Sequence, residues 1–456
     1  MINVLKIVVA CFVFCTGIYA HEGHNHQHPS TTTTTTQNNG QTTNHDNTLN
    51  NSQDHSTHDH STHSHQGHDL AAHTDCGHDS HSEFKADETA FHHISDLNVY
   101  SIGPWNFPLP CILYSKDQGW SFFSSSKFDI DNHHHGSGNK AVDRYALNMG
   151  RVMRIIDASF PMGEVSVQGF TTAETEVDGK KKEINYVCAN GQKYELEKTS
   201  SVDGGLFGGG FTSFYDFSIT KNVFAMLLVI GFMSILFLGM ASAYRRKPST
   251  APTGSQKLFE PIILFLQDEV AKPFIGAKYE RFMPLLLAIF FFILSLNLFG
   301  QIPFFGGANV TGNLAVTMVL AIIVFIVVNL NGNKHYWEHI LWMPGIPAWV
   351  KTLITPIEIL GVFIKPVTLM LRLFANITAG HIVIIIFISL IFIFGKAGAE
   401  PGAAYGASVA SVLLALFISA IELLVAFIQA YVFTLLTASY IGAATEEHHH
   451  PEKNHH

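Results

Sequence analysis

The sequence predicts an all-α polytopic membrane protein with about five transmembrane spans, preceded by a disordered tract and a small exported region with some β-structure. Two observations predict this class. The 456-residue chain is 47% hydrophobic and only 14% charged, and its apolar residues are concentrated after residue 204. Several stretches there reach the ~20 apolar residues that cross a bilayer. No basic run is long enough to suggest a nucleic-acid partner.

Composition divides the chain into segments of different character. They are a signal peptide at 1–20, a His- and Thr-rich disordered tract at 21–82, an exported domain at 83–203, a membrane domain at 204–443 and a cytoplasmic tail at 444–456. The first segment places Lys6 before an apolar core and ends on a small residue. This is the layout of a signal peptide, with an uncleaved anchor as the alternative. In either case the region that follows is expected to be exported.

The segment His21–His81 contains almost no apolar residue. It cannot bury enough surface to offset chain entropy, so disorder is predicted. Its histidines could hold zinc, copper or nickel loosely, but a solvated tether is the simpler interpretation.

The segment Glu83–Ser200 has enough aromatic and aliphatic residues for a small fold, but its residues suggest no chemistry. Apolar patterning predicts short strands at Ile112–Tyr114, Gly119–Phe123 and Glu183–Val187. Asp143–Ile156 instead has weak helical spacing.

Three cysteines follow the predicted signal peptide, namely Cys76, Cys111 and Cys188. Cys111 and Cys188 could pair in an oxidising compartment. Three cysteines do not define a framework, however, so the sequence leaves this disulfide open.

The membrane domain begins after a glycine-rich boundary with three stretches of ordinary span length. Val223–Ala243, Phe282–Gly300 and Leu314–Leu330 are each predicted to cross the membrane. Between them, Ser255–Arg281 and Lys334–Lys351 combine apolar residues or tryptophans with charges. This pattern predicts helices that lie along the interface.

The last two apolar stretches are longer than a simple span. Leu353–Phe394 and Tyr405–Ala443 each run for about forty residues without a clear break, twice the ~20 needed to cross. Helices of this length reach ~60 Å and must tilt steeply or break to stay in the bilayer. A hairpin of two long tilted helices is a surface suited to wrapping around a partner.

Basic residues indicate the orientation in the membrane. They gather in the connectors on one side of the predicted bundle, whereas the opposite loops, 301–311 and 395–404, contain only Lys396. The basic side is therefore predicted to be cytoplasmic, with the C-terminus inside and the N-terminal region outside.

Charged residues inside apolar spans are costly, so each is a candidate for function. Glu358, Lys365 and Arg372 are seven residues apart, and seven steps of about 100° place them on one stripe of a helix. Asn376 lies one turn beyond Arg372. His381 lies nine residues beyond Arg372, or ~13 Å, roughly on the opposite face.

On the next helix, Glu422 and Gln429 are again seven residues apart and share a face. The predicted topology puts Glu422 at a depth similar to that of His381. We therefore expect these two side chains to pair across the hairpin, and Gln429 to come level with Asn376 or Arg372.

Glutamate and histidine can pass protons, whereas arginine stays protonated. Arg372 is therefore predicted to act as a fixed positive charge between two polar paths, attracting a carboxylate and repelling cations. Simpler roles stay open for the other residues: snorkelling for Lys365, a structural pair for His381 and Glu422, interhelical hydrogen bonds for Asn376 and Gln429, and exposure to cytoplasmic water for Glu358.

Three motifs carry a family resemblance. They are LRLFANITAGH at Leu371–His381, ELLVAFIQAYVFTL at Glu422–Leu435, and NLFGQIP at the end of Tyr279–Pro303. Together they resemble the ATP synthase a subunit family. The resemblance covers about Ser218–Ala443, half of the chain.

This resemblance implies a non-catalytic, proton-translocating subunit of a rotary ATP synthase in the inner membrane. It implies a c-subunit ring, a b-subunit stator and lipid as partners, and neither a cofactor nor a metal. Arg372 would face the ring carboxyls and separate two offset half-channels. The residues implied for the exported-side channel are Asn376, His381, Glu422 and Gln429, and the cytoplasmic channel would contain Glu358.

The chain departs from many bacterial members in one respect. Those members have an acid where His381 stands and a histidine where Glu422 stands. We interpret the exchange as one that keeps a proton relay.

Two other classes of protein compete with this interpretation. A stand-alone cation or metal transporter with a His-rich exported tract should have two similar repeats and metal ligands at the midplane. The sequence has no such repeat, and its midplane residue is an arginine. An anchor for the exported domain would need neither several spans nor a polar stripe.

Overall fold

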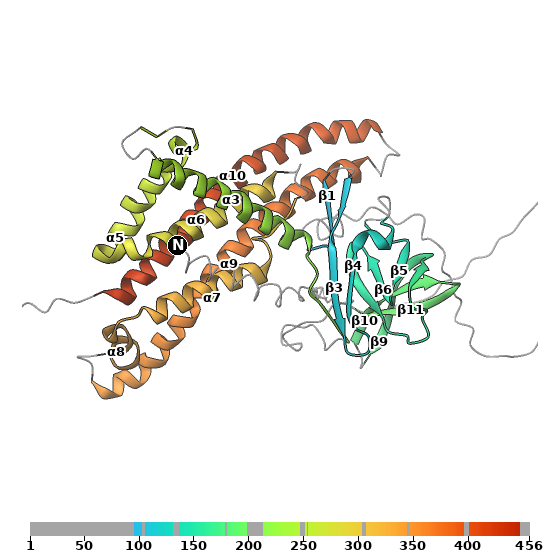
Figure 1. Ribbon diagram of the computed structural model, residues 1–456, viewed down its shortest axis with the longest axis horizontal. Coiled ribbons are helices and arrows are strands. Elements are labelled where there is room, and N and C mark those ends of the chain that lie inside the picture. Colours follow the sequence, from blue (N-terminus) through green and yellow to red (C-terminus); the bar gives the residue numbers. More distant parts are fainter. Residues whose placement is uncertain are drawn as a thin grey trace, which may run out of the picture. The chain divides into compact units, whose positions relative to one another are not determined.

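The structure is a computed structural model that describes residues 95–102, 105–130, 136–177, 180–197, 213–246, 251–252, 254–302, 307–343, 347–395 and 401–446. The predicted signal peptide, the His-rich tract and the tail beyond residue 446 lie outside the described residues. Strands occupy the described region before Lys221 and helices the region after it (Figure 1). The prediction of some strands in the N-terminal region and of helices in the apolar half is confirmed.

An antiparallel sheet of seven strands forms the larger part of the β-region, in the order β8-β5-β6-β7-β11-β10-β9. Its strands are β5 (Lys140–Val142), β6 (Tyr145–Asn148), β7 (Arg151–Ile155), β8 (Glu164–Ser166), β9 (Gly169–Val177), β10 (Lys180–Ala189) and β11 (Gln192–Glu197). Apolar side chains cover both faces at its centre. Leu147 and Val152 belong to one buried cluster, and Ala146 and Met153 to another.

The helix suggested for Asp143–Ile156 is wrong, and this two-sided burial is the reason. The segment folds as the hairpin β6–β7, which turns at Met149 and Gly150 with φ of 48° and 76°. Strands that are buried on both faces lose the alternation of apolar and polar residues by which a strand is recognised.

A three-stranded antiparallel sheet in the order β12-β3-β4 lies beside a separate hairpin. The sheet consists of β3 (Pro110–Ser115), β4 (Gly119–Ser124) and β12 (Phe214–Asp216). The hairpin consists of β1 (Val99–Ile102) and β2 (Trp105–Pro108). The 3₁₀ turn η1 (Ser125–Phe128) follows β4. The three predicted strands are confirmed, because they lie within β3, β4 and β10.

Cys111 and Cys188 do not pair with each other. Cys111 has a free, buried thiol on β3, whereas Cys188 on β10 is disulfide-bonded. The two residues belong to different sheets. Burial raises the pKa of the Cys111 thiol to about 12, so this side chain behaves as a small apolar core residue.

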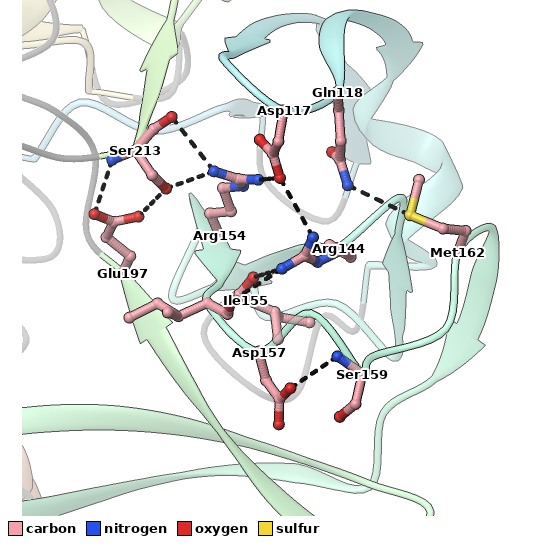
Figure 2. A network of polar contacts seen from close by, with 11 residues as sticks. Asp117, Gln118, Arg144, Arg154, Ile155, Asp157, Ser159, Met162, Glu197 and Ser213 are labelled. Carbon is pink, nitrogen blue, oxygen red and sulfur yellow. Dashed lines mark hydrogen bonds and ion pairs between the residues drawn. The ribbon is translucent and has the colours of Figure 1, made fainter.

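Two buried arginines share one carboxylate at the edge of the β-region (Figure 2). Asp117 accepts hydrogen bonds from Arg154 and, at 3.4 Å, from Arg144. Arg154 also donates to the hydroxyl of Ser213 at 2.5 Å, and Glu197 accepts from the backbone N–H of Ser213 at 2.9 Å. The network therefore connects β7 and β11 to the segment that leads into the first membrane helix.

Replacing Asp117 by asparagine is expected to destabilise the β-region by about 2 kcal/mol, because it leaves two buried guanidinium groups without their counter-charge. This is below the cost usual for a buried pair, because the Asp117 side chain is 49% exposed. The rate at which a protease cleaves within residues 95–216 of the full chain should rise roughly thirtyfold.

Glu164→Gln is the matched control for this prediction. The Glu164 side chain is also 49% exposed. Its partner is the ammonium of Lys140, which lies 3.7 Å from the Glu164 carboxylate and is exposed as well. Exposed ion pairs contribute little, so this variant should be cleaved like the unaltered chain. Equal cleavage of both variants would contradict the structural role of Asp117.

The first membrane helix, α3 (Lys221–Arg246), begins against the β-region. Asp96 accepts a hydrogen bond from the backbone N–H of Asn222 at 3.0 Å, and Lys221 N–H donates to the carbonyl of Leu97 at 2.7 Å. A carboxylate at a helix N-terminus satisfies an otherwise unpaired N–H and interacts favourably with the helix dipole. These bonds attach the start of α3 to the segment that precedes β1.

The remaining helices account for almost all of the apolar half. They are α4 (Ser255–Phe265), the π-turn η2 (Leu266–Ala271), α5 (Lys272–Ile275), the 3₁₀ turn η3 (Gly276–Lys278), α6 (Tyr279–Gln301), α7 (Leu314–Leu330), α8 (Lys334–Trp342), α9 (Ala348–Phe394) and α10 (Pro401–Thr445). In the described part of the chain, four helical stretches are long and apolar enough to cross a membrane. A fifth results if α7 and α8, which meet at 103°, form one span.

The segment Ser255–Arg281, predicted to lie along the membrane interface, is divided into several helical elements. The chain runs through α4, η2 and α5 and breaks at Gly276, where φ is 72°. Leu266, Val270 and Ala271 are buried in the same cluster as residues of α6 and α10. The segment therefore packs against the bundle along part of its length, because one of its faces is apolar.

Two long helices form the predicted hairpin. The helices α9 and α10 have 47 and 45 residues and pack side by side (Figure 1). The prediction of two helical stretches of about forty residues is confirmed, and of the two alternatives, tilting or breaking, neither helix breaks. Pro356 and Pro366 lie inside α9 without ending it. These two helices carry every charged or amide residue that the sequence singled out in the membrane.

Candidate functional site

The packing of α9 determines which of its polar residues face outward. Leu369, Leu373 and Ile377, four residues apart, are buried in the cluster that includes α6 and α10. Arg372 and Asn376, each one residue before a member of this buried stripe, are exposed at its edge. The chain thus presents a guanidinium group on the open side of the helix pair.

His381 and Glu422 meet where α9 and α10 pack together. Nδ1 of His381 lies 3.6 Å from Oε1 of Glu422, and the two side chains are 15% and 4% exposed. The pairing expected from their depth is therefore found. The separation exceeds that of a hydrogen bond, and Oε1 of Glu422 is buried without a hydrogen-bond partner.

Gly380 and Gly300 lie next to this pair. A Cβ atom at Gly380 would lie 3.0 Å from Oε1 of Glu422. A Cβ atom at Gly300 would lie 2.8 Å from the carbonyl oxygen of Ala308 and 3.7 Å from Nε2 of His381. A larger residue at Gly380 would therefore press on the carboxylate of Glu422, whereas one at Gly300 would clash with the loop before α7.

A shell of neutral polar groups lies beside the pair. Asn297 donates to the carbonyl of Ala426 at 3.3 Å and accepts from the hydroxyl of Thr311 at 2.7 Å. Gln301 donates to the backbone carbonyl of Glu422 at 2.8 Å. These bonds connect the end of α6 to α10 and the loop before α7.

Asn297 and Gln301 were not among the residues predicted for the site. Both belong to the NLFGQIP motif, and both are polar residues at the end of an apolar stretch. That position in the sequence could have identified them as candidates. Thr311 and Thr378 carried no such signal. Thr378 on α9 donates to the carbonyl of Gly312 at 3.2 Å, a contact that depends on the path of the loop before α7.

Gln429 is buried on α10, seven residues or about two helical turns beyond Glu422. Among the described residues, no hydrogen bond joins it to Arg372 or Asn376. The expectation that Gln429 comes level with those residues therefore stays a prediction.

Glu358 and Lys365 lie on the N-terminal half of α9, where Glu358 is half-buried and Lys365 is exposed. The ammonium of Lys365 lies 5.4 Å from the ring centre of Tyr440 on α10. Lys365, Tyr440, Asn329 and several apolar residues line a small hollow of about 20 Å³ between α7, α8, α9 and α10. Polar groups are thus present on both sides of Arg372 along α9.

The described residues contain no group of three or more histidine, cysteine, aspartate or glutamate side chains that could hold a metal ion. Among the described residues, the carboxylate of Glu422 and the imidazole of His381 meet between α9 and α10. Such a pair can exchange a proton at moderate pH, whereas the nearby guanidinium cannot release one.

Comparison with known proteins divides the chain in the same place as its composition does. A family model described as ATP synthase A chain matches residues 223–442. A second, described as a domain of unknown function (DUF8433), matches residues 89–205.

Several curated relatives share the helical half. ATP synthase subunit a of Chloroherpeton thalassium is 40% identical over 253 residues, which are 54% of this chain and 71% of the relative. ATP synthase subunit a 2 of Chlorobaculum tepidum is 42% identical over 239 residues, 51% of this chain and 64% of the relative. ATP synthase subunit a of Myxococcus xanthus is 39% identical over 249 residues, 53% of this chain and 77% of the relative.

Proposed function

The chain belongs to the ATP synthase subunit a family, and on this premise we propose that it passes protons to and from a rotating ring of c subunits through two half-channels separated by Arg372. As a family member it is a non-catalytic subunit of the membrane sector, and its apolar helices make it a multi-pass membrane protein. The observation that carries the proposal is the contact between His381 and Glu422 on the helix pair that also bears an outward-facing arginine.

The exported-side route would run through the His381–Glu422 pair. Support comes from the buried carboxylate oxygen of Glu422, which has an imidazole at 3.6 Å and no hydrogen bond of its own. A buried acceptor without a hydrogen-bond partner destabilises the protein unless a proton or a water molecule binds to it. The neighbouring amides of Asn297 and Gln301 provide further polar groups beside the pair. Asn376 and Gln429 complete the proposed route toward the ring.

Arg372 would be the barrier between the two routes. Its exposed side chain lies among the exposed apolar residues Ile364, Val367 and Leu371. A guanidinium facing lipid costs a few kcal/mol or more, so this face is expected to meet a partner that supplies a carboxylate. The ring carboxyls are the proposed counter-charge, because arginine binds carboxylate through two parallel hydrogen bonds.

The cytoplasmic route would contain Glu358, two repeats of seven residues from Arg372 on α9. Support comes from the hollow lined by Lys365 and Tyr440, because Lys365 lies between Glu358 and Arg372 on α9 and contacts the ring of Tyr440 on α10. A hollow of this size has room for about one water molecule beside these polar groups.

The proposed orientation follows the basic residues, with the N-terminal region periplasmic and the C-terminus cytoplasmic. The b-subunit stator and the remaining synthase subunits are proposed partners together with the c-ring. The competing interpretation, a stand-alone cation or metal transporter, has no observation in its favour now that the family is known.

Water accessibility of each route tests the proposal. Single Glu422→Cys and Glu358→Cys variants would be made in the assembled complex and exposed to Ag⁺ from one membrane side at a time. Ag⁺ binds thiolates and is small enough to follow a water path. Protection from later alkylation in denaturant, measured by mass spectrometry, should occur from the exported side for Glu422→Cys and from the cytoplasmic side for Glu358→Cys.

Leu424→Cys and Leu360→Cys are the matched controls, because both leucines are exposed on the apolar surfaces of the same helices. They should react from neither side. Reaction of Glu422→Cys from the cytoplasmic side, or of both glutamate variants from the same side, would refute the two-route arrangement.

Deleting His24–His81 is expected to leave coupled ATP synthesis nearly intact, because the tract carries none of the residues of the proposed proton path. The measurement is the synthesis rate per assembled complex in vesicles. A Gly/Ser linker of the same length is the control for spacing. If both variants lose proton pumping while the complex still assembles, the tract has a role beyond that of a tether.

A further inference from the structure

The three-stranded sheet β12-β3-β4 has aromatic side chains on its outer surface. We call this surface the aromatic face, formed by Tyr114, Trp120, Phe122, Tyr215 and Phe217. The opposite surface of the same strands is core, since Cys111, Leu113 and Phe214 are buried. The strands alternate as expected, but both sets of side chains are apolar.

The rings of the aromatic face contact one another across the strands. Trp120 lies 5.1 Å from Tyr114, 5.9 Å from Phe122 and 5.6 Å from Phe217, measured between ring centres. Tyr215 lies 6.5 Å from Tyr114 and 6.4 Å from Phe217. The pairing register places Tyr114 opposite both Trp120 and Tyr215, which makes the face a continuous ladder.

The centre of this ladder is open. Trp120 is 54% exposed and Phe122 is 69% exposed. An antiparallel sheet with one face in water normally has polar residues on that face, and contiguous exposed aromatic patches mark interaction sites. The aromatic face therefore requires a covering surface.

The chain itself indicates what the covering surface is. Phe217 precedes Lys221, the first residue of the first candidate span, by four residues, a reach of at most ~14 Å. The connection is held in place, because Phe217 N–H donates to Ile112 at 2.8 Å and Ile219 N–H to Pro110 at 3.2 Å. The strand end at Phe217, one edge of the aromatic face, is thus held within this reach of the start of the first candidate span.

We propose that the aromatic face rests on the phospholipid surface of the membrane, on the side from which α3 enters. Tryptophan and tyrosine favour the headgroup level, where the ring is apolar on one side and its polar atom stays hydrated. Exposed Lys116 and Lys127, just before and just after β4, would be available to anionic headgroups. The lipid contact holds the β-region in a fixed orientation above the membrane helices. This inference does not depend on the proposed proton path.

Photo-crosslinking in the assembled complex tests the contact. Benzoylphenylalanine would replace Trp120 or Phe122 in separate variants, with Lys193 as the control, an exposed position on β11 of the other sheet. The complexes would be placed in vesicles of phosphatidylcholine and phosphatidylglycerol and irradiated. We expect lipid adducts, identified by mass spectrometry, at 120 and 122 at several times the yield at 193.

Three results would overturn the proposal: adducts at 120 and 122 to another subunit or a second copy of the chain, equal lipid adducts at all three positions, or no adduct at 120 and 122. If these variants do not assemble, fluorescence provides the second measurement. The difference between the unaltered complex and Trp120→Phe reports Trp120 alone. Brominated lipid should quench that difference signal, and an unquenched signal would equally overturn the proposal.

Discussion

Arg372→Ala is expected to abolish proton-driven ATP synthesis while the complex still assembles. The exposed guanidinium contributes nothing to the core of the helix pair, whose contacts on that helix come from Leu369, Leu373 and Ile377. Removing one partner of an arginine–carboxylate pair in a low-dielectric site costs about 3–5 kcal/mol, or roughly 10²–10⁴ in rate. The measurement is ATP synthesis in energised vesicles, normalised to complex recovered by purification.

Lys365→Ala is the matched control for Arg372→Ala. Lys365 lies one seven-residue repeat earlier on α9, is also exposed and is also a cation. Its ammonium contacts the ring of Tyr440, so the variant should lose only a cation–π contact worth about 0.5–1 kcal/mol. Normal synthesis in Arg372→Ala would refute the barrier role. Equal losses in both variants would show that Arg372 has no role that Lys365 does not share.

The helical half was largely predictable because a bilayer demands long apolar segments with internally satisfied backbones. The two long helices were therefore visible in the sequence. The packing of Ser255–Arg281 was not predicted: its charges indicate an interface, and its apolar residues Leu266 and Val270 pack in the same cluster as residues of α6 and α10. Periodicity gives the buried face of a helix but not which neighbour covers it.

In the β-region, a strand could be predicted from the sequence only where one of its two faces is polar. The segments within β3, β4 and β10 were recognised, whereas β6 and β7 were taken for a helix because both of their faces are buried. The cysteines were not predictable, since spacing along the chain does not tell which thiols meet in space.

The candidate site was predictable where it contained charges. Arg372, His381 and Glu422 are conspicuous inside apolar sequence, and depth alone paired the last two. Asn297 and Gln301 were not assigned because a neutral amide is common as an interhelical hydrogen-bonding group. Their place beside Glu422 depends on the loop before α7 and on Gly300, whose path a periodicity argument does not give.

The exchange of the buried pair is the sharpest test of its chemistry. His381→Glu alone would put two carboxylates about 3.6 Å apart, and like charges at that distance cannot both ionise. Glu422→His alone would leave two imidazoles and no acid. Each single variant is expected to lose roughly ten- to hundredfold of the synthesis rate, the cost of a buried polar group without its partner.

The double variant His381→Glu with Glu422→His restores one acid and one base in the space bounded by Gly380 and Gly300. Its synthesis rate is therefore expected to exceed that of either single variant, and the excess measures the coupling between the two residues. The control is Asn376→Gln with Gln429→Asn, since no described contact joins those residues and their exchange should bring no recovery. A double variant no better than the worse single would mean that His381 and Glu422 are neighbours without being a relay.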